Sequence, residues 1–315
     1  MIEPIDLSKV QTKSIRERAN KVRIDLFGEV TEPEGRFTQF VDALPDILKA
    51  RDFKELCQRL NTARKAKRAI ILAMGDALIK VGLTPYILRL MDEGFITALA
   101  MQGAGIIHDT EIALIGETSE DVQVTITDGS FGMAEETGSF IHSAIKEGVK
   151  NGIGLGEAVG RKMDEAAPPH REHSLTWQAW KRGIPLTVHV AYGTDIIHMH
   201  PEADGAVIGK ATEIDFRKFA ALVCQLEGGA IINAASAVIL PEVFLKSLSL
   251  ARNLGHKVSD FTAANMDMLQ HYRPMENVVK RPTTTGGRGF ALTGNLEILF
   301  PLLTLCLLDI KKRDG

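Results

Sequence analysis

The sequence predicts an α/β protein with a doubly wound, mostly parallel sheet resembling a Rossmann fold, and three observations support this class. Apolar runs of strand length alternate along the chain with segments of helical periodicity. The runs end at glycine-bearing loops, and near-continuous apolar strands are typical of parallel sheets buried on both faces. The clearest stretch, Ala69–Gly116, reads as strand, tight loop, helix, strand, second tight loop and helix. This alternation favours one sheet covered by helices on both faces.

Composition is that of an ordinary globular protein. The chain has 315 residues, 45% of them hydrophobic and 24% charged, with a net charge of −3 and a pI of about 6.3. No basic field favours nucleic acid, and no apolar run reaches the roughly 18 residues that a membrane span needs. The N-terminus lacks an apolar signal region, and the 3 cysteines are far apart. We therefore expect reduced thiols in a cytoplasmic protein that binds neither nucleic acid nor membrane.

The segment before the first strand is expected to be accessory to the sheet. Residues 1–36 are polar and irregular and predict an N-terminal arm with helical extension. Two helices are expected next, at Phe37–Arg51 and Asp52–Ala66. Residues 37–315 are then predicted to form a single α/β domain.

The central unit predicts a ligand-binding edge. Ala69–Ala73 reads as a strand, an amphipathic helix runs from Leu78 to Gly94, and Ile96–Met101 reads as a second strand. Two strands joined by a helix form a parallel unit with a right-handed crossover. Ligands bind at the carboxyl ends of strands in open α/β sheets. These ends carry Gly75, Asp76, Gly103, Ala104 and Gly105.

The middle of the chain is expected to be mainly helical. Val122–Ile126 has the character of a short strand, and a helix is expected to start at the turn Thr127–Ser130, with Glu135 and Glu136 near its N-terminal end, and to run to Gly148. The glycine run Gly152–Gly160 resembles a phosphate-binding loop, but it follows a helix. Because the dinucleotide fingerprint requires a preceding strand, we interpret this run as a connection between two helices.

The second half continues the alternation. Strands are predicted at Ile184–Ala191, Gly229–Ala235 and Asp260–Ala264, and helices at Ser174–Arg182, Glu213–Leu226, Pro241–Leu254 and after Asn295. Two segments are expected to be irregular: Ala191–Gly209, and the chain from Ala264 to Gly289. The first is rich in glycine, histidine and aspartate, and long loops of this kind are usually functional.

Three groups of residues could carry chemistry. The strand ends form the first, together with Asn233–Ser236, because small residues let a nucleotide approach the backbone beside a helix N-terminus. Small residues are, however, common at the strand ends of any parallel sheet. The second group could bind zinc, or hydrogen-bond to a substrate or to the loop itself. It consists of His189, His198 and His200 with Asp195 and Asp204.

The third group follows the strand near Ala264. Its carboxylates could hold an amine and its arginine a carboxylate or phosphate; a surface loop with ion pairs is the alternative. The group contains Asn265, Asp267, His271, Arg273 and Glu276. Lys280 comes shortly after, and it would form a Schiff base if buried or remain solvated if exposed.

Several stretches resemble deoxyhypusine synthase in their order and spacing. The longest is MGDALIKVGLTPYILRLMDEGFITALAMQGAGIIHD, in which the glycine loop is followed by the acidic Asp109. The resemblance resumes at SLTWQAWKRGIPLTVHV, TDIIHMH and GGAIINAASAVILPEVFLKSLSLARNLG, and ends with RPMENVV and LEILFPLL. Together these stretches cover most of residues 65–305.

The resemblance implies a specific biochemistry. Members of that family form homotetramers with sites at subunit interfaces. They use NAD to oxidise spermidine, and they pass its aminobutyl group to a lysine of a translation factor through an imine on an enzyme lysine. By resemblance, Glu276 would lie near the polyamine. NAD would lie against Asp76, Ala77, Gly103, Ala104, Gly105, Ala234, Ala235 and Ser236.

The sequence departs from the family where the covalent step occurs. The imine-forming lysine falls on Pro282, which cannot form an imine, and a family histidine falls near Leu240-Pro241. A glycine triplet is replaced by Ala234-Ala235-Ser236, and an acidic pair by Ile107-His108. The scaffold and the nucleotide are therefore better supported than aminobutyl transfer.

The leading hypothesis is an NAD-binding enzyme of the deoxyhypusine synthase type that acts on a small amine or polyamine and assembles as an oligomer, by resemblance a tetramer. Asp267 and Glu276 would hold the ammonium group. The candidates for acid–base or covalent catalysis are His108, Asp195, His200 and Lys280. Two alternatives are a metal-dependent hydrolase built on the histidines at 189, 198 and 200, and a non-catalytic oligomeric binding protein.

Overall fold

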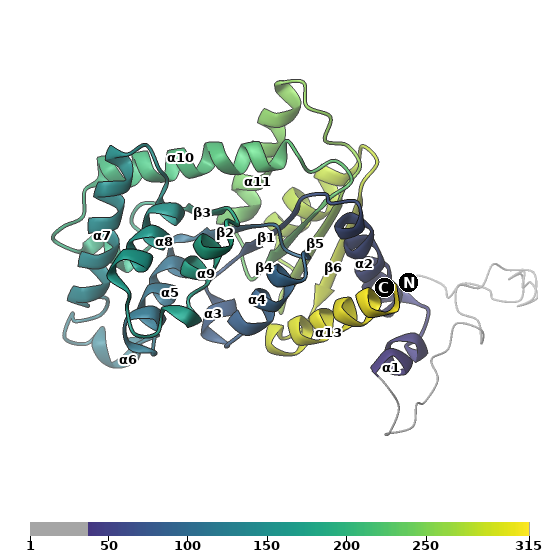
Figure 1. Ribbon diagram of the computed structural model, residues 1–315, viewed down its shortest axis with the longest axis horizontal. Coiled ribbons are helices and arrows are strands. Elements are labelled where there is room, and N and C mark those ends of the chain that lie inside the picture. Colours follow the sequence, from purple (N-terminus) through teal and green to yellow (C-terminus); the bar gives the residue numbers. More distant parts are fainter. Residues whose placement is uncertain (1–36, 315) are drawn as a thin grey trace, which may run out of the picture.

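The computed structural model describes residues 37–314, which build one parallel six-stranded sheet with helices on both faces (Figure 1). The strand order is β3-β2-β1-β4-β5-β6, and every neighbouring pair is parallel. The strands are β1 Ile70–Met74, β2 Ala98–Gln102, β3 Leu186–His189, β4 Ala230–Ala234, β5 Thr262–Asp267 and β6 Arg288–Thr293. The predicted doubly wound fold is confirmed. The predicted arm, residues 1–36, lies outside the described residues.

The order of the strands reverses between β1 and β4. From β1 the chain builds outward to β2 and β3, then returns across the sheet and builds outward through β4, β5 and β6. The loops after β1 and β4 therefore diverge to opposite faces of the sheet. This is the topological switch point, beside which doubly wound proteins bind their ligands.

Helices complete the layers. In chain order they are α1 Phe37–Ala43, α2 Leu48–Lys65, α3 Ala77–Lys80, α4 Thr84–Asp92, α5 Gly103–Ile115, α6 Val122–Thr125, α7 Glu135–Lys150, α8 Leu155–Ala166, η3 Arg171–His173, α9 Leu175–Arg182, η4 Ile196–Met199, α10 Gly205–Val223, α11 Ile239–Asn253, α12 Tyr272–Pro274, η5 Met275–Lys280, η6 Arg281–Thr283 and α13 Leu296–Asp314. No helix within residues 37–314 combines the length and apolar character that crossing a membrane requires.

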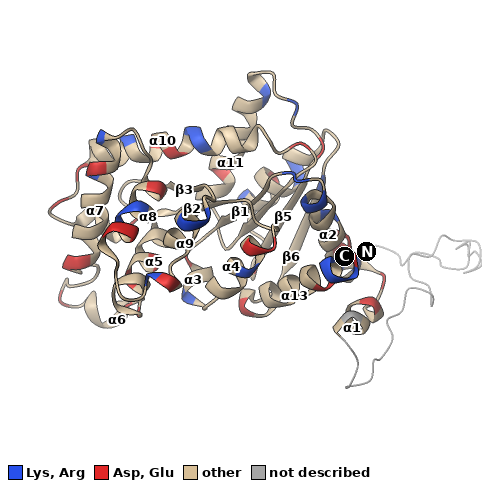
Figure 2. Cartoon of the chain, viewed as in Figure 1, with Lys and Arg blue, Asp and Glu red and all other residues tan. Residues whose placement is uncertain are grey.

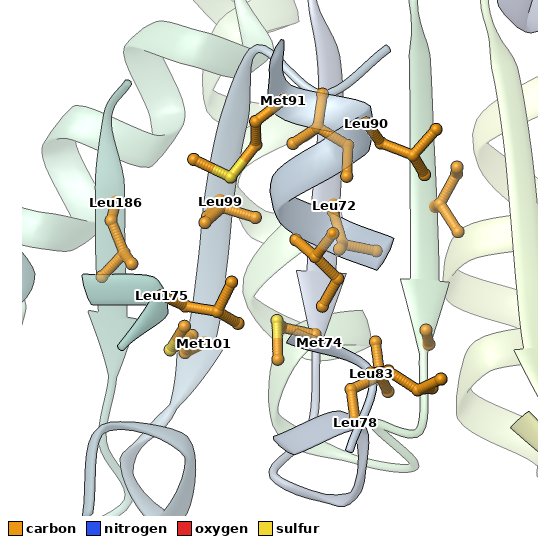
Figure 3. Packing of buried hydrophobic residues seen from close by; sticks show 14 of the residues in the cluster. Leu72, Met74, Leu78, Leu83, Leu90, Met91, Leu99, Met101, Leu175 and Leu186 are labelled. Atoms are coloured by element: carbon orange, nitrogen blue, oxygen red, sulfur yellow. The ribbon is translucent and has the colours of Figure 1, made fainter. Parts of the chain in front are cut away.

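Alternate residues of the strands build two cores. Leu72 and Met74 of β1 face the larger core, and Ile71 faces the smaller one, which α10 and α11 cover. Figure 3 shows Leu78 and Leu83, from the crossover between β1 and β2, packed beside Met74 in the larger core. Fully burying each such side chain is worth about 1.5–3 kcal/mol. Charged side chains lie on the helices and loops, and the strands are largely free of them (Figure 2).

Several expected elements differ from the observed ones. Val122–Ile126 was expected to be a strand but forms helix α6, whose first turn is capped by Asp121 through the Gln123 amide. Its apolar side chains are exposed, so their pattern does not reflect burial in the sheet. The helix expected from Leu78 to Gly94 is divided into α3 and α4, because Gly82 adopts a positive φ of 75°.

The chain between Ala264 and Gly289 was expected to be irregular, and this was wrong. It contains α12, η5 and η6, and the edge strand β6 begins at Arg288. Helix α10 also begins earlier than expected, at Gly205, because the Asp204 carboxylate accepts hydrogen bonds from the amides of Ala206 and Val207.

The start of the glycine run connects α7 to α8, as predicted, but α8 begins at Leu155, so Gly156 and Gly160 lie inside this helix. Buried Asp215 accepts hydrogen bonds from the amides of Gly156 and Val188, both at 2.9 Å. A Cβ atom on Gly154 would lie 1.8 Å from this carboxylate, and one on Gly156 would lie 2.4 Å from the Leu186 carbonyl. These glycines therefore allow α8 to pack against β3, and Asp215 occupies the helix N-terminus.

Candidate functional site

A pocket of about 650 Å³ opens beside the carboxyl ends of β1, β2 and β3. Its walls come from α3, α5, the segment around α6, and the loop before η4. Apolar side chains such as Ile107, Phe131 and Met133 line part of it. The ionisable side chains in its lining are Lys80, His108, Glu111, Glu117, Glu120 and Asp195. Four of these six are carboxylic acids, so the pocket suits a cationic ligand.

Asp76 lies at the junction of the first two strands. The pairing of Met74 with Met101 places the ends of β1 and β2 side by side, and the Gln102 amide donates to Asp76 Oδ1 at 2.7 Å. The second oxygen, Oδ2, lies 3.6 Å from Lys80 Nζ and 3.7 Å from His108 Nε2. Asp76 thus links the sheet edge to two ionisable side chains of the pocket.

The hydrogen bonds of His108 indicate where its proton lies. Its Nδ1 is 2.7 Å from the Thr118 hydroxyl, which donates its own proton to Glu111. The hydroxyl can therefore only accept from His108, so in the neutral ring Nδ1 carries the proton and Nε2 is free to act as a base. Burial lowers the pKa of His108 below its usual value, although the neighbouring Asp76 opposes this.

Asp195 lies over the N-terminus of α5. It accepts a hydrogen bond from the Ala104 amide, and burial raises its pKa to about 6, with the charge of Asp76 acting in the same direction. A Cβ atom on Gly103 would lie 2.0 Å from Asp195 Oδ2. Glycine at position 103 thus allows the Asp195 carboxylate to approach the backbone. This carboxylate occupies the start of α5, where the sequence predicted a phosphate.

The three predicted histidines have separate partners. His189 is buried beside Phe219 and hydrogen-bonded to Thr187, and burial lowers its pKa to about 3. His198 stacks on Tyr192, and the ring of His200 lies 5.7 Å from that of His142. Across residues 37–314, no three His, Cys, Asp or Glu side chains are arranged to hold a metal ion. The zinc interpretation of these histidines therefore gains no support.

The predicted cofactor residues after β1 and β4 meet at the switch point. Gly75 donates to the Ala234 carbonyl at 2.9 Å, and a Cβ atom on Gly75 would lie 2.0 Å from the Ala235 carbonyl oxygen. Ala235 has a positive φ of 54° at the position where the family resemblance implies glycine. Ser236 is fully buried, and its Oγ accepts from the Leu240 amide.

The starts of α11 and α5 are the two helix ends that a phosphate could approach at the predicted cofactor site. Helix α11 has 15 residues, and its N-cap residue, Val238, is exposed and provides no side-chain cap. Helix N-termini attract phosphate through unpaired amides, but here the Leu240 amide donates to Ser236 Oγ, residue 241 is a proline without an N–H, and Glu242 adds a carboxylate to the first turn. At α5, the Asp195 carboxylate already accepts a hydrogen bond from the Ala104 amide. Neither helix start therefore offers a phosphate a complete set of free amides.

The residues predicted to bind the amine lie elsewhere. Asp267 ends β5 and accepts from the Leu269 amide at 3.5 Å. Glu276 and Lys280 are on η5 and pair with each other at 2.7 Å, and the hydrogen bond from Lys280 lowers the pKa of Glu276. The Lys280 side chain is 59% exposed. None of the three lines the 650 Å³ pocket.

The sequence interpretation missed several residues that line the pocket or support its lining. Glu111 and Thr118 complete the hydrogen-bond chain from His108, and Gln102 anchors Asp76. The spacing of His108 and Glu111 on one face of α5 was an available signal. No signal in the sequence connected Thr118 to them, because its position depends on how the chain turns after α5.

The fold places the protein in the Rossmann-like class of α/β proteins. No family model matches the sequence, and no curated protein matches it either. Solved structures share the fold at low identity. A protein described as LOR/SDH from Methanococcus maripaludis S2 has 16% identity and a TM-score of 0.53, over 84% of this chain and 71% of that one.

Two further neighbours carry informative descriptions. AgrE, solved as a ternary complex with ornithine and NAD⁺, has 14% identity and a TM-score of 0.53; the match covers 86% of this chain but only 35% of AgrE. A protein described as a deoxyhypusine synthase from Entamoeba histolytica has 11% identity and a TM-score of 0.50, over 90% of this chain and 96% of that one. At these identities, the likeness establishes the fold alone.

Proposed function

We propose that this protein is an NAD-dependent enzyme that oxidises a small amine or transfers its aminoalkyl group. The observation that carries the proposal is the acidic pocket at the carboxyl ends of β1–β3, the edge of the sheet at which doubly wound proteins bind their ligands. Neighbours described with NAD⁺ and ornithine, or as a deoxyhypusine synthase, support the same class of chemistry. The resemblance of the sequence to deoxyhypusine synthase points in the same direction.

Each part of the site would have a separate role. Gly75, Ala235 and the start of α11 would hold NAD, which would supply a hydride acceptor for oxidation of the amine. Glu111 and Asp195 would hold the ammonium group in the pocket. With a pKa of about 6, Asp195 is ionised at neutral pH and can take a proton from the bound ammonium. His108 Nε2 is a second candidate base.

Binding of NAD is tested by thermal unfolding of the cofactor-stripped protein. A ligand at 100 times its dissociation constant stabilises a fold by about 2.7 kcal/mol, so the midpoint should rise clearly with NAD. Addition of diamines, polyamines or amino acids should then produce NADH absorbance. Stabilisation by NAD without turnover of any amine would instead favour a non-catalytic binding protein.

A matched pair of variants at Val238 tests the location of the phosphates. Val238→Asp and Val238→Asn introduce side chains of nearly the same size, but only aspartate adds a negative charge where the phosphates would lie. We expect the Asn variant to retain stabilisation by NAD and the Asp variant to lose it. Equal stabilisation of both variants by NAD would exclude the start of α11 as the phosphate site.

We also propose that the protein assembles as an oligomer. Large apolar side chains are exposed at the carboxyl ends of β4 and β5, and such patches mark interaction surfaces. They are Val238, Met268, Leu269 and Tyr272. The tetramer implied by the family resemblance is tested by sedimentation velocity; a monomer at micromolar concentration would contradict it.

A further inference from the structure

His198 lies beside Asp195, and its own ring is held by the backbone. Its Nδ1 accepts hydrogen bonds from the amides of Gly193 and Asp195, both at 3.1 Å. The ring also stacks on Tyr192, with 4.7 Å between centroids. The loop before η4 therefore fixes the imidazole in one orientation.

These backbone bonds determine the tautomer of His198. Because Nδ1 accepts two amide protons, its lone pair is in use, and the proton of the neutral ring lies on Nε2. Burial lowers the pKa of His198, which favours this neutral form. Nε2 is therefore a hydrogen-bond donor.

This donor lies opposite a matching acceptor. Nε2 of His198 is 3.9 Å from Oδ2 of Asp195, and the two side chains are only 2% and 6% exposed. Both atoms are buried and have no other hydrogen-bond partner. Unpaired buried polar atoms are rare and costly, and a small rotation of the carboxylate would pair these two.

We propose that His198 is a positioning residue for Asp195, whose carboxylate accepts a hydrogen bond from His198 Nε2 when it is ionised. The backbone amide of Ala104 would hold the carboxylate from one side and the imidazole from the other. The ionised carboxylate is thereby kept in one orientation toward the pocket. This role rests on the proposed function only in that Asp195 is taken as the base for a bound amine.

Other ionisable groups surround the pair. Asp76 on the β1 side raises the pKa of Asp195, and Lys80, His108 and Glu111 line the same pocket. From α7, His142 faces His198 and disfavours its protonation. Any test must therefore separate the effect of the Nε2 proton from these background charges.

Two isosteric variants separate the roles of the two ring nitrogens. His198→Asn retains an acceptor near the Nδ1 position, for the amides of Gly193 and Asp195, but lacks the Nε2 donor. His198→Gln retains a donor near the Nε2 position but lacks the Nδ1 acceptor. The ionisation of Asp195 is followed by ¹³C NMR of the labelled aspartate carboxyl groups, and Asp195→Asn identifies its signal.

We expect the pKa of Asp195 to rise by about one pH unit or more in His198→Asn, because the ionised carboxylate loses a charge-assisted hydrogen bond. In His198→Gln the pKa should stay near that of the native protein, while the thermal midpoint falls because two loop amides lose their acceptor. An unchanged pKa in His198→Asn would overturn the proposal. The measurement needs neither NAD nor an amine, so failure of the proposed function would leave this result interpretable.

Discussion

The two halves of the sheet's carboxyl edge differ in the kind of polar side chain that they carry. Beyond β4 and β5, Asn233 donates to Asn265 and to the Ser236 carbonyl, and Asn265 donates to Gln270, which in turn reaches β6 through the Leu292 carbonyl. These side chains are neutral amides that bond mainly to one another; Asn233 Oδ1 has no partner, and one buried carboxylate, Asp267, ends β5. Beyond β1, β2 and β3, the polar groups are carboxylates and imidazoles.

The titratable half is also the half with space for a ligand. Asp195 and His108 line the pocket, and Asp195 Oδ2 and His198 Nε2 have no partner. Titratable groups whose pKa values are shifted beside a cavity are typical of functional sites. The comparison suggests that the amide network stabilises the sheet while the β1–β3 half carries the chemistry.

The largest expected effect would come from Asp195→Asn. The variant keeps an acceptor for the Ala104 amide, so the fold should be retained, but it cannot take a proton. Loss of a general base typically costs 10²–10⁴-fold, so we expect kcat for amine-dependent NADH formation to fall by about that factor.

Substitutions in the other half provide the control. If the comparison holds, Asp267→Asn and Glu276→Gln should change kcat/KM by less than about tenfold, which corresponds to 1.4 kcal/mol. The opposite ranking would place the amine near β5 and η5, as the family resemblance implies, and would refute the assignment of chemistry to the β1–β3 half.

A second effect concerns the pH dependence of stability. Burial raises the pKa of Asp215 in the folded protein to about 7. As the pH rises from about 4 to 7, the unfolded state releases this proton before the folded state does, so this group's contribution to stability falls. Relative to Asp215→Asn, the native protein should lose about 2–3 kcal/mol between pH 5 and 7.

Urea unfolding of both proteins at the two pH values measures this difference. All other titrating groups are shared, so their contributions largely cancel in the comparison. The asparagine carbonyl can still accept from Gly156 and Val188. A constant difference across this pH range would mean that Asp215 is already ionised in the fold.

A third effect tests the amide network. Asn265 is fully buried, and Asn265→Ala would leave Gln270 Oε1 without this donor and Asn233 without one of its two acceptors. We expect a loss of about 2 kcal/mol, measured by urea unfolding. Gln270→Ala is the milder control, because this residue is only partly buried. Equal stability of Asn265→Ala and the native protein would remove the structural role that we give to this half.

The smallest effect is expected at Lys280. Its side chain is largely exposed and paired with Glu276, and exposed ion pairs contribute only about 0–1 kcal/mol. Lys280→Ala should therefore unfold at nearly the same urea concentration as the native protein. Turnover of the amine decides the predicted covalent role. If Lys280→Ala loses turnover, and borohydride traps an adduct on Lys280 of the native protein, then Lys280 takes the role of the family's imine-forming lysine, whose position is occupied here by Pro282.

The sequence alone determined the class of fold and the principal strands. Runs such as Ile96–Met101 are apolar on both faces because they lie inside a parallel sheet, and this pattern is local and readable. The sequence also identified Asp76, His108 and Asp195 as candidate site residues. Strand β6 was not predicted. Only 3 of its 6 residues are buried, so its apolar run is too short to indicate a strand.

Tertiary structure decided which candidates lie together. Asp195 follows β3 and Ala104 follows β2, so they meet only because those strands are neighbours in the sheet. Glu276 and Lys280 follow β5, on the other side of the switch point. The separate partners of the three histidines likewise depend on the packing of α7, α10 and the loop before η4. The spacing of apolar residues in the sequence identifies strands and helices. Which side chains come together depends on the order of the strands in the sheet, and local patterns carry no information about that order.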